Sequence, residues 1–156
     1  MSAASDITDA KEACNQHQFS TFYVSGRLYG IDVTKVQEVV RTLPMTPIPL
    51  SEDYVLGLIN LRGQVATAIG LQELFGFNEQ TDGELMNVVC KCEGNLISLQ
   101  VDGIGDVIEV SEENFEPIPQ TISTDVRKFM SGVCKVSDKL LSIIDINLVM
   151  KDLNSQ

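Results

Sequence analysis

Histidine and tryptophan are nearly absent from this sequence, which has one of the former, His17, and none of the latter. His17 falls in a polar segment near the N-terminus, where we expect no core to position it. A Ser-His or Cys-His catalytic pair needs a base held in a fixed geometry. The sequence also lacks a glycine-rich phosphate loop, because Gly103-Ile104-Gly105 is too short to indicate a nucleotide site. Nucleophilic catalysis and nucleotide chemistry are therefore poorly supported.

Paired cysteine motifs are missing too. The four cysteines show no CxxC spacing, and Cys90-Lys91-Cys92 offers only two thiols on one strand face, which does not complete a tetrahedral zinc site. We expect no metal, no cofactor and free thiols, as in a reducing cytoplasm. The cysteines are Cys14, Cys90, Cys92 and Cys134.

Positive charge is scarce: 11 Lys and Arg stand against 22 Asp and Glu, a net charge of −11. Nucleic acids and anionic membrane surfaces attract clustered Lys and Arg, so this balance argues against both as partners. No apolar run approaches the ~18 residues that would span a bilayer. The first ten residues do not read as a secretory signal either. We expect a cytoplasmic protein.

What is present is enough hydrophobic sequence to form a folded core. The chain has 156 residues, 44% of them hydrophobic, enough for one domain or for two small ones that share an interface. We interpret residues 1–18 as a flexible tail. Short alternating segments then predict strands, beginning with Phe19–Val24 and Leu28–Ile31. Ser51 is expected to start a helical turn that ends at Gly57, and Asn147 to cap a C-terminal helix.

The chain also repeats itself. The pattern Val33-x-x-Val36-x-x-Val39-Val40 returns as Val101-x-x-Ile104-x-x-Val107-Ile108, and Ile48-Pro49 returns as Ile118-Pro119. Offsets of about seventy residues indicate two homologous units rather than a solenoid. Each unit has about five predicted strands, which is the size of a small closed barrel. We therefore predict two small β-barrels packed side by side across an apolar interface, with a groove lined by the two valine-rich segments.

One stretch presents polar side chains from a rigid position. Leu58, Asn60 and Arg62 alternate with Ile59 and Leu61, so the first three are predicted on one strand face and the last two in the core. Gly63 permits a sharp reversal, and Val65–Leu71 is expected to form the returning strand. The sequence thus predicts an Arg-Gly hairpin.

Two other function classes remain open on the residues alone. Asp102, Asp106 and Asp145 are candidates for acid–base chemistry, although Asp102 and Asp145 read more easily as turn and exposed positions. An SH3-like module that reads proline-rich peptides would need an aromatic-lined groove, and the chain has only six Phe and three Tyr.

Four ordered motifs resemble the CheW family. They begin at Tyr29-Gly30-Ile31-Asp32 and Val36-Gln37-Glu38-Val39, continue through Gly57–Gly63, and end at Val101–Val107. The resemblance implies an all-β fold of two SH3-like five-stranded β-barrels side by side, with short helical turns and a C-terminal helix. It implies a CheW-like domain over 19–156, formed by two intertwined subdomains of approximately 19–84 and 85–156.

The resemblance further implies a non-enzymatic scaffold of bacterial chemotaxis. Such a scaffold couples the cytoplasmic tips of methyl-accepting receptors to the regulatory domain of the histidine kinase CheA, and it contacts other CheW copies. The positions expected at or near the receptor or kinase contacts are Val33, Val36, Glu38, Val39, Gly57, Leu58, Asn60 and Arg62. We also expect Glu38 and Arg62 to pair across the first barrel.

The chain departs from the family at three positions. Thr67 replaces the usual proline, and Gly70 and Gln72 replace the Asp and Arg of an Asp-Leu-Arg segment. These changes leave an alternative open, a divergent paralogue that binds receptors without the kinase.

Overall fold

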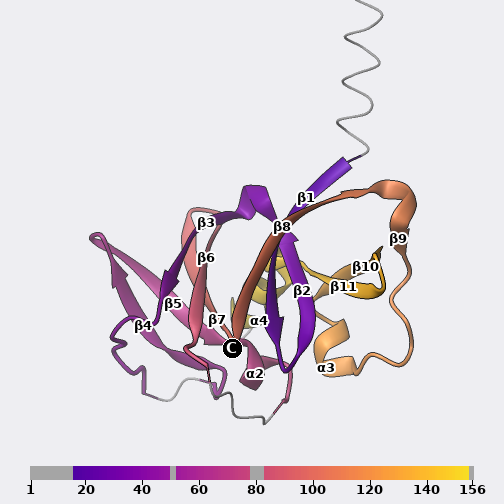
Figure 1. Cartoon of the computed structure of the whole chain (residues 1–156). Coiled ribbons are helices and arrows are strands. Elements are labelled where there is room, and N and C mark those ends of the chain that lie inside the picture. The colour runs from indigo at the N-terminus through magenta and orange to yellow at the C-terminus, as the bar shows by residue number, and fades with distance from the viewer. Residues whose placement is uncertain (1–15, 50–51, 78–82, 155–156) are drawn as a thin grey trace, which may run out of the picture.

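Two antiparallel-rich sheets make up the computed structural model, which describes residues 16–49, 52–77 and 83–154 (Figure 1). Sheet A has the strand order β8-β1-β2-β11-β10-β9, and sheet B has the order β3-β6-β7-β5-β4. The strands of sheet A are β1 (Gln16–Val24), β2 (Arg27–Asp32), β8 (Gly103–Ser111), β9 (Phe115–Glu116), β10 (Met130–Val136) and β11 (Lys139–Ile144). Those of sheet B are β3 (Val36–Arg41), β4 (Val55–Leu61), β5 (Gln64–Gly70), β6 (Met86–Cys92) and β7 (Asn95–Val101).

Each half of the chain lends its first hairpin to the sheet of the other half. The hairpin β1-β2 lies between β8 and β11, and the hairpin β6-β7 lies between β3 and β5. In both sheets the second strand of this hairpin pairs in parallel with a strand of the other half: β2 pairs with β11, and β7 pairs with β5. The two sheets therefore share one strand order, as the predicted internal repeat requires.

This exchange decides how the predicted subdomains sit in the fold. The all-β fold with SH3-like sheets is confirmed, and the sheets are intertwined because strands from before and after residue 84 meet in both. The prediction of closed five-stranded barrels is wrong, since both strand orders are open and sheet A has a sixth, two-residue strand, β9. Strand β1 begins at Gln16, so it includes the last three residues of the predicted tail, 1–18. The rest of that tail lies outside the described residues.

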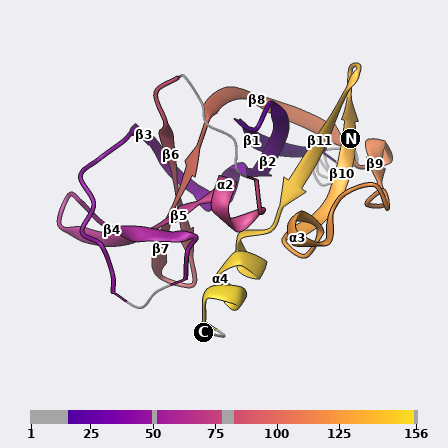
Figure 2. The same cartoon turned by 90° about the horizontal axis from the view of Figure 1, so that it is seen from below.

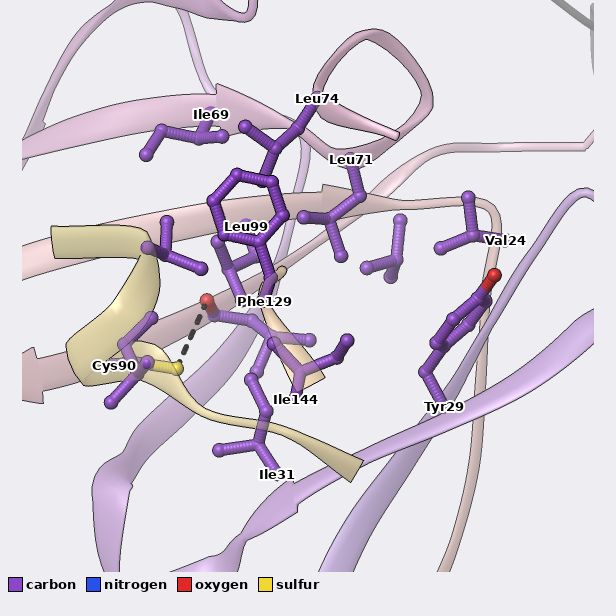
Figure 3. Packing of buried hydrophobic residues seen from close by; sticks show 14 of the residues in the cluster. Val24, Tyr29, Ile31, Ile69, Leu71, Leu74, Cys90, Leu99, Phe129 and Ile144 are labelled. Atoms are coloured by element: carbon purple, nitrogen blue, oxygen red, sulfur yellow. Dashed lines mark hydrogen bonds between the residues drawn. The ribbon is translucent and has the colours of Figure 1, made fainter. Parts of the chain in front are cut away.

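The largest hydrophobic core lies between the two sheets. It takes Phe22 and Tyr29 from sheet A, Ile97 and Leu99 from sheet B, and Phe75 from the segment after β5. Figure 3 shows the close packing of this cluster, in which Ile31 and Ile144 from one sheet lie near Cys90 and Leu99 from the other. Each sheet has a smaller cluster of its own. An apolar interface was predicted between two side-by-side barrels; the main core instead lies between two sheets that each contain strands of both units.

Short helices occupy the connections between strands. The structure has the 3-10 turns η1 (Val33–Lys35) and η2 (Glu112–Asn114), and the helices α2 (Leu71–Leu74), α3 (Thr124–Arg127) and α4 (Ile146–Asn154). Figure 2 shows α2 at the junction of the two sheets, with α4 beside it. The C-terminal helix is thus confirmed.

Two of the predicted helix ends are wrong. Asp145 Oδ1 accepts a hydrogen bond from the Asn147 N–H at 2.9 Å, so Asp145, not Asn147, caps α4. The helical turn predicted from Ser51 to Gly57 does not reach Gly57, because β4 already begins at Val55; Ser51 itself lies outside the described residues. Val55 instead pairs with Ile69 of β5, and a bulge at Leu56 separates this pair from the pairing of Gly57 with Ala68.

Candidate functional site

The hairpin between β4 and β5 turns on two residues in the left-handed region. Arg62 has a φ of 53° and Gly63 a φ of 83°, while Leu61 pairs with Gln64 across the turn. A two-residue turn with both φ values positive matches the twist of antiparallel strands. Asn60 Oδ1 accepts a hydrogen bond from the Gly63 N–H at 3.1 Å and holds this turn closed. The Arg-Gly hairpin predicted from the sequence is therefore observed, with Arg62 in the turn itself rather than in the strand.

Arg62 reaches from this turn to the other edge of sheet B. Its Nη1 donates to Glu38 Oε2 at 3.0 Å. The Arg62 side chain is 79% exposed and the Glu38 side chain 19% exposed. The predicted pair of Glu38 and Arg62 is thus confirmed. β3 and β4 are the two outer strands of sheet B and do not pair with each other through backbone hydrogen bonds. The ion pair therefore links these two unpaired edges through side chains.

Strand β3 presents an alternating face. Val36, Glu38 and Val40 are half-buried, and Val39 is exposed. A bulge separates Val36 from Glu38 where the strand pairs with β6, as is common on edge strands. Val36 packs against the main core and Val40 against the small cluster of sheet B. Glu38 therefore lies between two valines that pack against buried clusters, and this packing fixes the position of its carboxylate.

Val33 lies just before this strand, on the turn η1. Asp32 Oδ1 accepts hydrogen bonds from the Thr34 N–H at 2.9 Å and from the Thr34 hydroxyl at 2.7 Å, which start the turn. The first valine-rich segment of the repeat thus contains a 3-10 turn, η1, followed by a strand, β3. Val33 is half-buried and adjoins the edge that carries Val39.

Gly57 has a role that the sequence did not indicate. It is buried, its φ is 152°, and a Cβ at this position would lie 2.6 Å from the Thr46 carbonyl oxygen. The neighbouring Leu58 exchanges two backbone hydrogen bonds with Thr46, at 2.8 and 2.9 Å. Gly57 therefore lets the proline-bearing connector close onto β4, and it offers no side chain to a partner.

The structure brings some of the predicted positions together and separates others. Glu38, Asn60 and Arg62 gather at the hairpin tip, while Gly57 and Leu58 lie toward the start of β4, against Thr46. Sequence reasoning missed Val65, which is 60% exposed and pairs with Asn60 beside the tip. The two-residue turn at Arg62-Gly63 fixes the strand register, and this register predicts that Val65 lies opposite Asn60. Thr46 gave no such signal, because its contact depends on the fold of the connector.

The two segments predicted to line an apolar groove place exposed apolar residues on equivalent edges of the two sheets. Val39 on β3 is 37% exposed, and Ile104 and Val107 on β8 are 38% and 58% exposed. Strands β3 and β8 occupy the same outer position in the two sheets. The valines noted in the repeat are thus offered on both edges.

One of the three departures from the family pattern, Gln72, contacts a carboxylate. Asp102, between β7 and β8, accepts hydrogen bonds from the Ser25 N–H at 2.7 Å and from Gln72 Nε2 at 2.8 Å. Gln72 belongs to α2, and Gly70 is the residue before that helix. Thr67 lies on β5, where it pairs with Leu58. Gln72 therefore joins α2 to the β1-β2 turn through Asp102.

No cluster of metal-binding side chains occurs in the described ranges. They hold no group of three or more His, Cys, Asp or Glu that could hold a metal ion. Burial raises the pKa of Cys90 to about 12 and that of Cys134 to about 11, so both thiols are protonated near neutral pH. Asp102 and Asp145 accept backbone hydrogen bonds in separate turns. The acid–base cluster proposed for Asp102, Asp106 and Asp145 is therefore not formed.

His17 was predicted in a flexible tail, but the structure places it in a strand. It lies on β1, with its Nε2 3.4 Å from Glu112 Oε1 and its ring 5.2 Å from that of Phe115. The prediction that no core positions it is wrong, because the β1-β8 pairing extends to Gln16. Separately, no helix in the described part of the chain is long and apolar enough to cross a membrane.

These features define an all-β protein of two SH3-like sheets with a polar hairpin and two apolar strand edges. The model of the CheW-like domain matches residues 18–154, and the chain belongs to the CheW family. The chemotaxis protein CheW of Treponema pallidum is 32% identical over 142 residues, covering 86% of this chain and 84% of that protein. The CheW of Bacillus subtilis is 32% identical over 136 residues, covering 86% and 87%. A crystal structure of the scaffolding protein TtCheW from Thermoanaerobacter tengcongensis superposes with a TM-score of 0.75 at 32% identity, covering 83% of this chain and 88% of that one.

Proposed function

We propose that this protein is a non-catalytic scaffold that couples chemotaxis receptors to the histidine kinase CheA. Its relatives are named chemotaxis proteins, and its structural neighbour is named a scaffolding protein. The observation that carries the proposal is the Glu38–Arg62 pair, which lies inside the two family motifs and fixes both charges at the tip of a rigid hairpin. We propose cytoplasmic action, with recruitment to receptor arrays at the inner face of the membrane.

The receptor contact is assigned to the side of sheet B that carries this pair. Arg62 offers a largely exposed guanidinium, and Val39 offers an exposed apolar side chain from the neighbouring edge. A helical receptor tip presents apolar and charged side chains at three- and four-residue spacing, which suits such a surface. Val33, Val36 and Asn60 support this surface, and Gly57 and Leu58 act by holding the connector against β4.

The direct test is a pull-down with two baits. Purified protein is offered a receptor cytoplasmic fragment and, separately, the regulatory domain of the cognate kinase, as wild type and as Arg62→Ala. Lys151→Ala is the matched control, because Lys151 is an exposed cation on α4, outside sheet B. Binding to both baits, with receptor binding weakened by Arg62→Ala alone, supports the proposal. Binding to neither bait contradicts it.

A second candidate, a paralogue that binds receptors without the kinase, is favoured by the residues around Asp102. Gln72 is a neutral partner for this carboxylate at a position where the family usually has a base. The change alters the charge of the surface at α2 while keeping the fold. Retention of the receptor fragment without the kinase domain would select this candidate.

A further inference from the structure

A cleft of about 510 Å³ opens at one end of sheet A, away from the Glu38–Arg62 hairpin. Its walls come from the β1-β2 turn, the start of β11, the segment before α3 and Phe77. The floor is apolar, with Leu28, Tyr29 and Val126 all buried. A volume of this size lies within the range of about 300–1,000 Å³ that holds small organic ligands.

Two cations stand at the rim of this cleft. Arg27 lies over the Phe77 ring at 4.8 Å, and Lys139 lies over the Tyr23 ring at 5.6 Å. Strands β2 and β11 pair in parallel, so the turns that carry these cations lie at the same end of the sheet. The aromatic faces hold both charges in place while leaving their outer sides open.

Neither cation has a carboxylate partner within 4.0 Å among the residues that the structure describes. This is unexpected in a chain with twice as many acidic as basic residues. The nearby Asp102 carboxylate is already bound by Ser25 and Gln72. The cleft therefore combines an apolar floor with two positive charges that have no carboxylate partner among the described residues.

The hydrogen bonding of the walls limits what can bind. Both β2 and β11 are interior strands of sheet A, so the cleft offers no free strand edge to an extended peptide. An occupant must be recognised by the side chains alone, through its charge and its apolar body.

We propose that this cleft binds a small organic anion, with its apolar body against Leu28 and Val126 and its anionic group between Arg27 and Lys139. A carboxylate, a sulfonate and a phosphate share the required chemistry. The ligand would act on a surface separate from the proposed receptor contact, so the site is a second function of the fold.

The test uses 8-anilino-1-naphthalenesulfonate as the probe, with the uncharged N-phenyl-1-naphthylamine as the matched ligand. Fluorescence titrations compare wild type, Arg27→Gln, Lys139→Gln and the double variant, with Lys91→Gln as the control. We expect each single cleft variant to weaken sulfonate binding about tenfold, about 1.4 kcal/mol, and the double variant to weaken it further. Binding of the uncharged probe should change little in any variant.

Localisation comes from backbone amide chemical shifts on titration with the sulfonate. Shifts confined to the cleft and lost in Lys139→Gln support the proposal. Equal sulfonate binding by wild type and the double variant, or shifts centred elsewhere, overturn it. Lys139 is exposed, so its substitution leaves the core intact, and near-ultraviolet circular dichroism verifies the fold of each variant.

Discussion

The Arg62 guanidinium and the Glu38 carboxylate meet at 3.0 Å across the two outer strands of sheet B. Exposed ion pairs contribute only about 0.2–1 kcal/mol to stability. The pair therefore sets the positions of two charges much more than it holds the fold.

A double-mutant cycle with Glu38→Gln and Arg62→Gln separates these roles. In the free energy of unfolding we expect a coupling below about 1 kcal/mol, further reduced by added salt. In binding to a receptor cytoplasmic fragment we expect both single variants to weaken the complex, with clear coupling. Additive effects on binding would show that the two charges act separately.

Gly57→Ala should destabilise the protein, because its Cβ would meet the Thr46 carbonyl oxygen at 2.6 Å and its φ is 152°. We expect a loss of at least about 1–3 kcal/mol in urea denaturation. Gly94→Ala is the control, since Gly94 has a φ of 82° but open space around its Cβ position. Equal losses of stability in the two variants would mean that the close contact with Thr46 adds nothing to the cost of the positive φ.

Asp102→Ala should leave the β1-β2 turn without its side-chain acceptor. Two donors lose their partner here, and because both hydrogen bonds are part-buried we expect a loss of about 1 kcal/mol. The measurement is the midpoint of chemical denaturation. Asp106→Ala serves as the comparison, because the Asp106 side chain is exposed and accepts no hydrogen bond among the described residues. A midpoint shift no larger than that of Asp106→Ala would contradict this role.

The buried thiols predict a pH dependence. Burial raises the pKa of Cys90 to about 12 and that of Cys134 to about 11, both above the pKa of about 9 of a free thiol. A raised pKa in the folded state favours folding while the thiols are protonated, so this contribution is complete below pH 9 and is lost between pH 9 and 12. Stability against urea should fall over that window, and less so in Cys90→Ala than in wild type.

The same thiols should resist modification. In a Cys14→Ser background, we expect Cys90, Cys92 and Cys134 to react slowly with a disulfide reagent at pH 8 and rapidly after unfolding. Fast reaction of the native protein would show that the core opens readily.

The sequence carried the local pattern well and the pairing of distant segments poorly. Alternation at Leu58–Arg62 and the Arg-Gly pair were sufficient to predict the hairpin, since both depend on adjacent residues. The Glu38–Arg62 pair could be proposed because each charge lies inside a family motif. Nothing local indicates that β1-β2 inserts between β8 and β11, or that Thr46 lies against Gly57, because such contacts are decided by which apolar faces cover one another.

The exchanged hairpins predict that neither half folds alone. Fragments 1–84 and 85–156 should each give poorly dispersed amide spectra, since each lacks the strands that flank its first hairpin. An equimolar mixture should recover the spectrum of the intact protein. Cooperative unfolding of either fragment by itself would contradict this expectation.

The parallel pairing of β2 with β11 has a consequence for biosynthesis. Tyr29 on β2 meets Ser142 on β11, and these residues lie near opposite ends of the chain. Contacts of such high sequence separation form slowly, because the intervening chain loses conformational entropy before the contact contributes stabilising free energy. During translation, β2 would keep an uncovered edge until β11, more than a hundred residues later, has left the ribosome. The nascent chain would therefore pass most of its synthesis as a client for chaperones, and it would become competent for its partners in one late step.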